Sequence, residues 1–152
     1  MSISKKEMYH GAVLYQVVRN PDSSIKLIER DKNKHGYGAY EVTTNTKTYV
    51  LLIKYRSETR TGWTCCDFTF LPQHIEDLRK YCDKELLICL VCHSNHVCVL
   101  TQRDIKELKL LQRNGSCGVT VCWEKGSELT VRSKHSKLPR KIPRNRLKTL
   151  QW

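Results

Sequence analysis

Two apolar runs limit the fold of this chain more than any other feature of its sequence. Residues 48–55 read Thr-Tyr-Val-Leu-Leu-Ile-Lys-Tyr, and residues 86–92 are seven apolar residues in succession. Apolar residues on both faces are typical of a strand that other elements cover on each side. The two runs therefore predict central strands, and Lys54, near the end of the first run, needs a reason to lie there.

Helix and strand signals around the two runs predict the order of the other elements. Ser4 and Glu7 have the spacing of a capping box, which indicates a helix that ends before Pro21. Runs over 25–30 and 38–44 read with residues 48–55 as an antiparallel meander. In chain order, we then expect an extended run over 63–70, a helix from 72 to about 82, the strand over 86–92, a returning strand over 96–100, a capped helix from 101 to about 113 and a hairpin over 119–132.

This order predicts an α/β fold: an αβββαβ core with a mixed sheet, plus a C-terminal β-hairpin and a basic tail. We expect one α/β domain over 1–129 and a basic extension over 130–152. Beyond the hairpin, this extension is expected either to be extended or mobile, or to dock partly on a surface through the apolar residues between its basic ones. No apolar run reaches the roughly 18–20 residues that a membrane helix needs. The first ten residues lack the apolar stretch of a signal peptide. We therefore expect a cytoplasmic protein with no membrane partner.

Positive charge is concentrated at the C-terminal end of the chain. The net charge is +12, and residues 130–152 hold eight basic side chains and no acidic one. A charge of this kind favours polyanionic partners, with nucleic acid first among them, and we expect DNA rather than RNA. The alternative is that the charge only maintains solubility. The predicted nucleic-acid-binding residues are Arg132, Lys134, Lys137, Arg140, Lys141, Arg144, Arg146, Lys148 and Trp152, whose ring could stack on a base.

The chain holds eight cysteines, which we interpret as reduced thiols of a cytosolic protein. Most are expected as small buried apolar residues. A zinc site is the alternative for one group, because a turn at residues 94–95 would gather neighbouring sulfur and imidazole ligands. Its members would be Cys92, His93, His96 and Cys98.

The predicted order and the position of Lys54 resemble the PD-(D/E)XK nuclease superfamily. That family has an αβββαβ core, with an acid on the second strand and a (D/E)-x-K motif on the third. Here the third strand reads Leu52-Ile53-Lys54, so Lys54 matches the family lysine. The resemblance covers roughly residues 4–112, and it implies a nuclease that uses Mg²⁺ and a lysine that stabilises charge or helps to activate water.

The sequence departs from that family at the acidic positions. Leu52 stands where the third-strand acid belongs, and Glu41 is the carboxylate available on the second strand, with Asp31 shortly before it. Under the resemblance, Lys54, Glu41 and Asp31 are the candidate catalytic residues, and Asp31 and Glu41 the candidate metal ligands. Mg²⁺ is expected only if the protein is catalytically active. Glu7 on the first helix is already explained by its capping box.

Three functions fit these observations. We predict a nucleic-acid-binding, nuclease-like domain with lost or weakened catalysis. The alternatives are an active metal-dependent endonuclease that cuts DNA, and a protein-interaction module whose basic tail docks on an acidic partner. Metal-dependent cleavage separates the second function from the others, and steep salt dependence separates nucleic acid from an acidic protein. Analogy with nuclease-like folds leaves a homodimer open.

Overall fold

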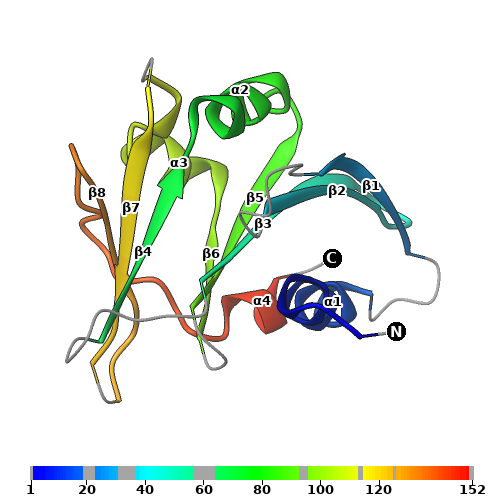
Figure 1. Cartoon of the computed structure of the whole chain (residues 1–152), viewed down its shortest axis with the longest axis horizontal. Coiled ribbons are helices and arrows are strands. Elements are labelled where there is room, and N and C mark those ends of the chain that lie inside the picture. Colours follow the sequence, from blue (N-terminus) through cyan, green and yellow to red (C-terminus); the bar gives the residue numbers. More distant parts are fainter. Residues whose placement is uncertain are drawn as a thin grey trace.

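The two apolar runs form the centre of a five-stranded sheet, as the sequence predicts (Figure 1). A computed structural model describes residues 2–18, 23–30, 37–56, 64–92, 96–112, 115–124 and 126–150. The first sheet contains β1 (Ser24–Arg30), β2 (Tyr37–Thr43), β3 (Thr48–Arg56), β5 (Glu85–Cys92) and β6 (His96–Leu100), in the order β1-β2-β3-β5-β6. Strands β3 and β5 pair in parallel, and the other neighbours are antiparallel. The predicted mixed sheet is therefore confirmed.

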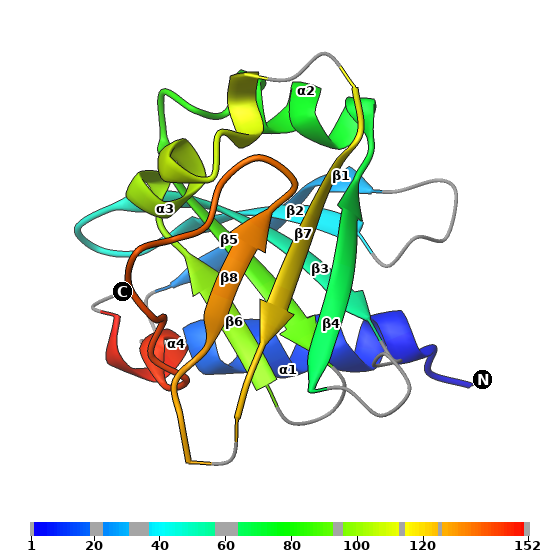
Figure 2. The ribbon, with the colours of Figure 1, turned by 90° about the vertical axis from the view of Figure 1, so that its left-hand side faces the viewer.

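A second, antiparallel sheet covers one face of the first (Figure 1). Its strands are β4 (Cys65–Phe70), β7 (Cys117–Cys122) and β8 (Thr130–Ser133), in the order β4-β7-β8. Side chains alternate across it: Phe68, Val119 and Val131 are buried on the inner face. In the described part of the chain, no helix lies over its outer face (Figure 2). The predicted C-terminal hairpin is thus the β7–β8 pair, and it serves to extend a sheet that begins with β4.

The helices divide between the two sides of the first sheet. The α-helices are α1 (Lys5–Val17), α2 (Pro72–Lys80), α3 (Gln102–Glu107) and α4 (Arg146–Thr149), and η1 (Leu110–Gln112) is a 3₁₀ turn. The capping box of α1 is confirmed, because the Glu7 N–H donates to Ser4 Oγ at 3.2 Å and the Ser4 N–H to Glu7 Oε2 at 2.8 Å. The described helices are all too short or too polar to cross a bilayer.

One predicted helix is shorter than its pattern indicated. The sequence predicts a helix from 101 to about 113, whereas α3 ends at Glu107 and the chain continues as η1. Lys109 adopts a φ of 57°, in the left-handed region that no α-helix contains. This backbone reversal ends the helix before Leu110 turns back into the core.

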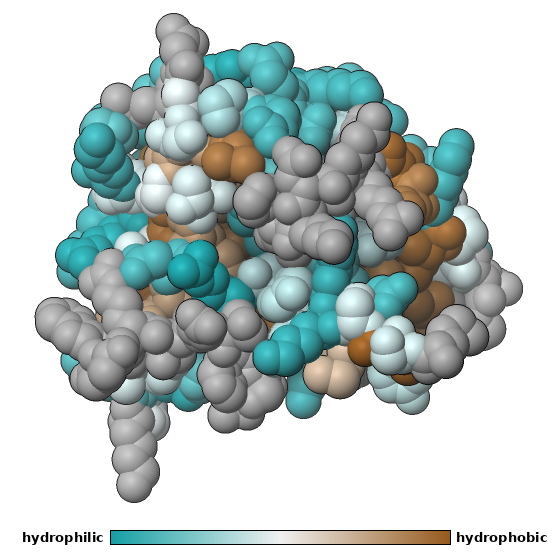
Figure 3. All heavy atoms as spheres, in the orientation of Figure 1, coloured by the Kyte–Doolittle hydropathy of each residue, from teal (hydrophilic) through white to brown (hydrophobic). Residues whose placement is uncertain are grey.

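Each face of the first sheet carries its own apolar core. Between the two sheets, Leu52, Ile88 and Leu90 pack with α2 and with the inner face of the second sheet. On the opposite face, α1 and α4 cover the alternate side chains of the same strands, such as Leu51 and Ile53. Few large apolar side chains reach the surface; brown atoms gather at the right of Figure 3, over β1, where Leu27 is 51% exposed.

The C-terminal segment packs on the fold, so beyond the hairpin the expectation of docking describes residues 134–150 and that of a mobile tail does not. Leu138, Ile142 and Leu147 are buried, and Leu129 and Ile142 exchange backbone hydrogen bonds at 2.9 and 2.7 Å. The sequence places these apolar residues between basic ones, and their burial holds the segment against the domain. Residues 151–152, including Trp152, lie outside the described residues.

A buried carboxylate fixes this C-terminal segment in place. Asp104 on α3 is fully buried and pairs with Arg140 and with Arg146, whose Nη1 lies 2.7 Å from Asp104 Oδ2. The Thr101 N–H also donates to Asp104 Oδ2 at 2.9 Å, which closes the helix cap. Burial by itself raises the pKa of Asp104, but the hydrogen bonds from Thr101 and Arg146 outweigh it, and the pKa lies below its ordinary value.

We predict that Asp104→Asn lowers the free energy of unfolding by about 3–5 kcal/mol, because two partly buried guanidinium groups lose their partner. The lowered pKa means that the carboxylate stabilises the fold above its unfolded pKa of about 3.9 and less as the pH falls through its folded pKa. Urea unfolding measured from neutral to acid pH should therefore show the variant's deficit shrinking below about pH 4.

The exposed Asp83 gives the matched control, since Asp83→Asn should change the unfolding free energy little. A deficit of Asp104→Asn that stays constant down to acid pH would contradict the role assigned to the carboxylate.

Two cysteines form a disulfide, which corrects the interpretation of all eight as reduced thiols. Cys65 on β4 and Cys122 on β7 face each other in register, are 57 residues apart in sequence and are bonded across the outer face of the second sheet. The sequence could not show this pairing because β4 and β7 meet only in the folded chain. The other six cysteines are free, and of these Cys82 alone is exposed.

Thiol titration tests this arrangement. We predict that one thiol, that of Cys82, reacts in the native protein and that six react after unfolding without reductant. Burial raises the pKa of the Cys89 thiol to about 12, which further slows the buried sulfurs. Replacing the pair, Cys65→Ser with Cys122→Ser, should lower the unfolding free energy by about 2–4 kcal/mol. Cys82→Ser is the control, and eight reactive thiols in the unfolded chain would exclude the disulfide.

Candidate functional site

A cavity opens where β3 meets β4 and the start of α2, and Lys54 lines it. The cavity has a volume of about 240 Å³. Lys54 is 4% exposed, and its Nζ donates to the Thr69 carbonyl at 2.5 Å and lies 3.1 Å from His74 Nδ1. The cavity is lined by Lys54, Tyr55, Arg56, Asp67, Phe68, Thr69, Leu71 and His74.

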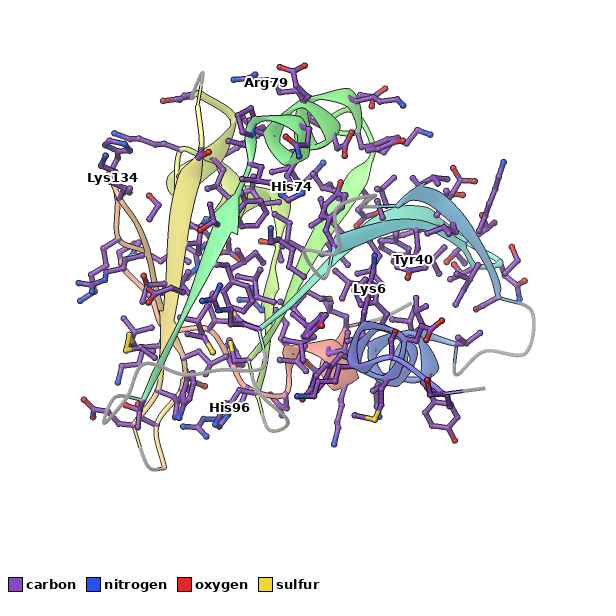
Figure 4. The ribbon with its side chains drawn as sticks, in the orientation of Figure 1. Lys6, Tyr40, His74, Arg79, His96 and Lys134 are labelled. Atoms are coloured by element: carbon purple, nitrogen blue, oxygen red, sulfur yellow. A yellow bond between two sulfur atoms is a disulfide. The ribbon has the colours of Figure 1, made fainter. Side chains whose placement is uncertain are left out.

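Aromatic rings and short hydrogen bonds hold Lys54 in this position. The Phe70 ring centroid lies 5.0 Å from Nζ, close enough for a cation–π contact. His74 stacks on Tyr37 with ring centroids 4.2 Å apart, and the Tyr37 hydroxyl donates to Asp77 Oδ2 at 2.6 Å. Figure 4 shows His74 below α2, on the side of the sheets. The lysine is therefore fixed by β2, β4 and α2 together.

His74 acts as an acceptor in this cluster. Its Nδ1 accepts from the Leu71 N–H at 3.2 Å at the start of α2 and faces the Lys54 ammonium. Because an ammonium can only donate, we assign the ring hydrogen of the neutral imidazole to Nε2. The imidazole thus joins the helix start to the lysine on β3.

The structure does not bring Glu41 to Lys54. Glu41 faces Val50 in the β2–β3 register, four residues along β3 from Lys54 and hence about 13 Å away along the strand. Glu41 Oε2 instead lies 3.7 Å from Lys84 Nζ. Tyr37 is the residue opposite Lys54. Asp31 lies outside the described residues, so its predicted role as a ligand stays a prediction.

The described lining of the cavity does not fit Mg²⁺. This ion prefers several oxygen ligands in an octahedron. The cavity offers one carboxylate, Asp67, beside the cationic Lys54 and Arg56, and the Thr69 carbonyl already accepts from Lys54. Among the described residues, no three His, Cys, Asp or Glu side chains gather as a metal site.

The residues considered for a zinc site on β5 and β6 are only partly described. Cys92 faces His96 in the register, and Cys98 faces Leu90, whereas His93 lies outside the described residues. The His96 ring packs on Trp123 with centroids 4.4 Å apart. Cys92 and Cys98 are buried in the apolar core between the sheets, where the described residues form no metal-binding group.

The described residues among the predicted nucleic-acid-binding set differ in what their side chains contact. The first group stabilises the fold: Arg140 and Arg146 pair with Asp104, and Arg144 donates to the Ser127 and Glu124 carbonyls. Lys141 bonds the Ser127 hydroxyl, and Lys148 is exposed on α4, on the other side of the first sheet. The second group lies on or beside β8 at the outer face of the second sheet and contains Arg132, Lys134 and Lys137.

Sequence reasoning missed three residues of the Lys54 cluster. Tyr37, Asp67 and His74 come from β2, β4 and α2, and His74 had the appearance of an ordinary first-turn helix residue. Asp67 carried a weak signal, since it interrupts the apolar residues around it in Cys-Cys-Asp-Phe-Thr-Phe. Nothing in the local sequence indicates that Tyr37 and Asp77 meet, because the contact joins two distant elements.

No protein-family model matches this chain, and no curated protein or solved structure matches it significantly.

Tyr37→Phe tests the bonded cluster around Lys54. The change leaves the ring stacked on His74 but removes the donor to Asp77, and we expect the free energy of unfolding to fall by about 1–3 kcal/mol. Chemical denaturation measures it, with Tyr15→Phe as the control because Tyr15 is 80% exposed. Equal stability of the two variants would show that the Tyr37 hydroxyl does not stabilise the cluster.

Proposed function

We propose that this protein is a nucleic-acid-binding, nuclease-like domain in which catalysis is lost or weakened. The observation that carries the proposal is the surroundings of Lys54. The lysine lies near the end of β3 in the order α1-β1-β2-β3-β4-α2-β5, which is the αβββαβ order with β4 of the second sheet inserted. Leu52 on β3 and Tyr37 and Ala39 on β2 stand beside it without a carboxylate. A nuclease of this kind needs such carboxylates to hold its hard cation at the scissile phosphate.

Charge supports the binding half of the proposal. The chain has a net charge of +12, and Arg56 lies exposed at the Lys54 cavity. Cations displace condensed counterions from phosphates, so affinity for nucleic acid should fall steeply with salt. We propose DNA rather than RNA as the target, and binding of the backbone rather than reading of base sequence.

Two other expectations from the sequence also stay proposals. A homodimer rests on analogy with nuclease-like folds. A cytoplasmic location has one observation against it, because the cytosol keeps most thiols reduced whereas Cys65 and Cys122 form a disulfide.

A combined binding and cleavage assay tests the proposal. Wild type and Lys54→Ala are incubated with plasmid and with single-stranded DNA, in Mg²⁺ or Mn²⁺ and in EDTA. We expect wild type to bind equally well with metal and with EDTA and to leave the DNA intact, since the described cavity does not fit the cation.

Two results would contradict this. Metal-dependent cutting that disappears in Lys54→Ala would make the protein an active endonuclease. Absence of any salt-sensitive binding would favour the acidic protein partner instead.

A further inference from the structure

We propose that the outer face of the second sheet is the docking surface, and that its ligand is a nucleic-acid double helix held through its phosphate backbone. This inference rests on the proposed function and specifies its surface and its substrate class. The face is formed by β4, β7 and β8 and is open to solvent in Figure 2.

Three cationic side chains gather at the β8 edge of this face. Arg132 lies on β8, and Lys134 follows directly after the last residue of that strand. Lys137 pairs with Arg132 across an isolated bridge, and the Lys134 N–H donates to the Gly118 carbonyl at 3.3 Å. Figure 4 shows Lys134 on the side of the second sheet that faces away from the first.

These three side chains are available to a ligand, unlike the arginines of the same segment. Arg132, Lys134 and Lys137 are exposed, and the structure records no ion pair for them with any described residue. Arg140 and Arg146, in contrast, are bound to Asp104. Of the eight basic residues in 130–152, these three are the ones exposed at this edge of the sheet.

The opposite edge of this face, at β4, adjoins the Lys54 cavity, whose lining includes Asp67, Thr69 and the exposed Arg56. From β4 across β7 and β8 to the Lys137 segment there are three interstrand spacings, about 14 Å in all. The face is therefore about as broad as the major groove of B-DNA, which is about 12 Å wide.

The surface between the two edges fits a backbone better than unpaired bases. Platforms for single strands stack bases on aromatic side chains. The outward residues of this sheet are small or polar: Cys65, Asp67, Thr69, Gly118, Thr120, Cys122, Thr130 and Arg132. A methyl group added at Gly118 would meet nothing within 4 Å, so the middle of the face is flat and open. The acidic Asp67 accepts from the Thr120 hydroxyl at 2.7 Å.

The experiment compares one DNA sequence as duplex and as single strand, over a range of salt concentrations. The test variant carries Arg132→Gln, Lys134→Gln and Lys137→Gln. The control carries Lys5→Gln, Lys26→Gln and Lys84→Gln, which remove the same charge from exposed positions around the first sheet. Circular dichroism and unfolding curves check that both variants fold.

We expect wild type to bind the duplex at least about tenfold more tightly than the single strand. Each backbone contact contributes about 0.9 to the slope of log affinity against log salt, so the test variant should lose a slope of about 3 and the control much less. Tighter binding of the single strand would overturn the inference but leave the proposed function standing. Equal losses in both variants would overturn the surface, and no binding to either DNA would overturn the proposed function itself.

Discussion

The placement of the whole C-terminal segment depends on one buried carboxylate. Asp104 is fully buried, caps the start of α3 through Thr101, and binds Arg140 and Arg146 from a segment more than thirty residues away. An isolated buried carboxylate is costly, so the two guanidinium groups are needed to keep Asp104 charged. The pairing positions the chain between β8 and α4: Arg146 also donates to the Val99 carbonyl at 3.0 Å, which ties α4 to β6.

A second buried charge, that of Lys54, is compensated in a different way. Its partners are a backbone carbonyl, an imidazole and two aromatic faces, at 2.5 Å to Thr69 O and at 5.0 and 5.9 Å to the rings of Phe70 and Tyr37. These neighbours satisfy the Lys54 ammonium, but none of them supplies a carboxylate to a metal ion. The described residues of the cavity therefore hold a buried lysine but lack the carboxylate cluster that metal-dependent hydrolysis requires.

Local signals in the sequence predicted the elements well, and failed where a contact joins distant segments. The two apolar runs and the capping boxes at Ser4 and Thr101 identified β3, β5, α1 and the start of α3, because strand burial and helix caps depend on neighbouring residues. The pairing of β4 with β7, and with it the Cys65–Cys122 bond, joins cysteines that lie 57 residues apart in sequence. The prediction of the candidate site was incomplete for the same reason. Lys54 was identified from its own strand, whereas Asp67 and His74 reach the cavity from other elements.

The charge of the C-terminal segment shows why composition alone misjudges a binding surface. By composition its basic residues are equivalent, yet Arg140, Arg144 and Arg146 bind carboxylates and carbonyls of the protein itself. Arginine suits this role, because its planar, always charged fork can satisfy several acceptors at once. The exposed cations left beside β8 are mainly lysines, with Arg132. The internal pairs therefore hold the chain that follows the basic edge, whereas β8 is held by its pairing with β7, so the two sets of basic residues are positioned by different interactions.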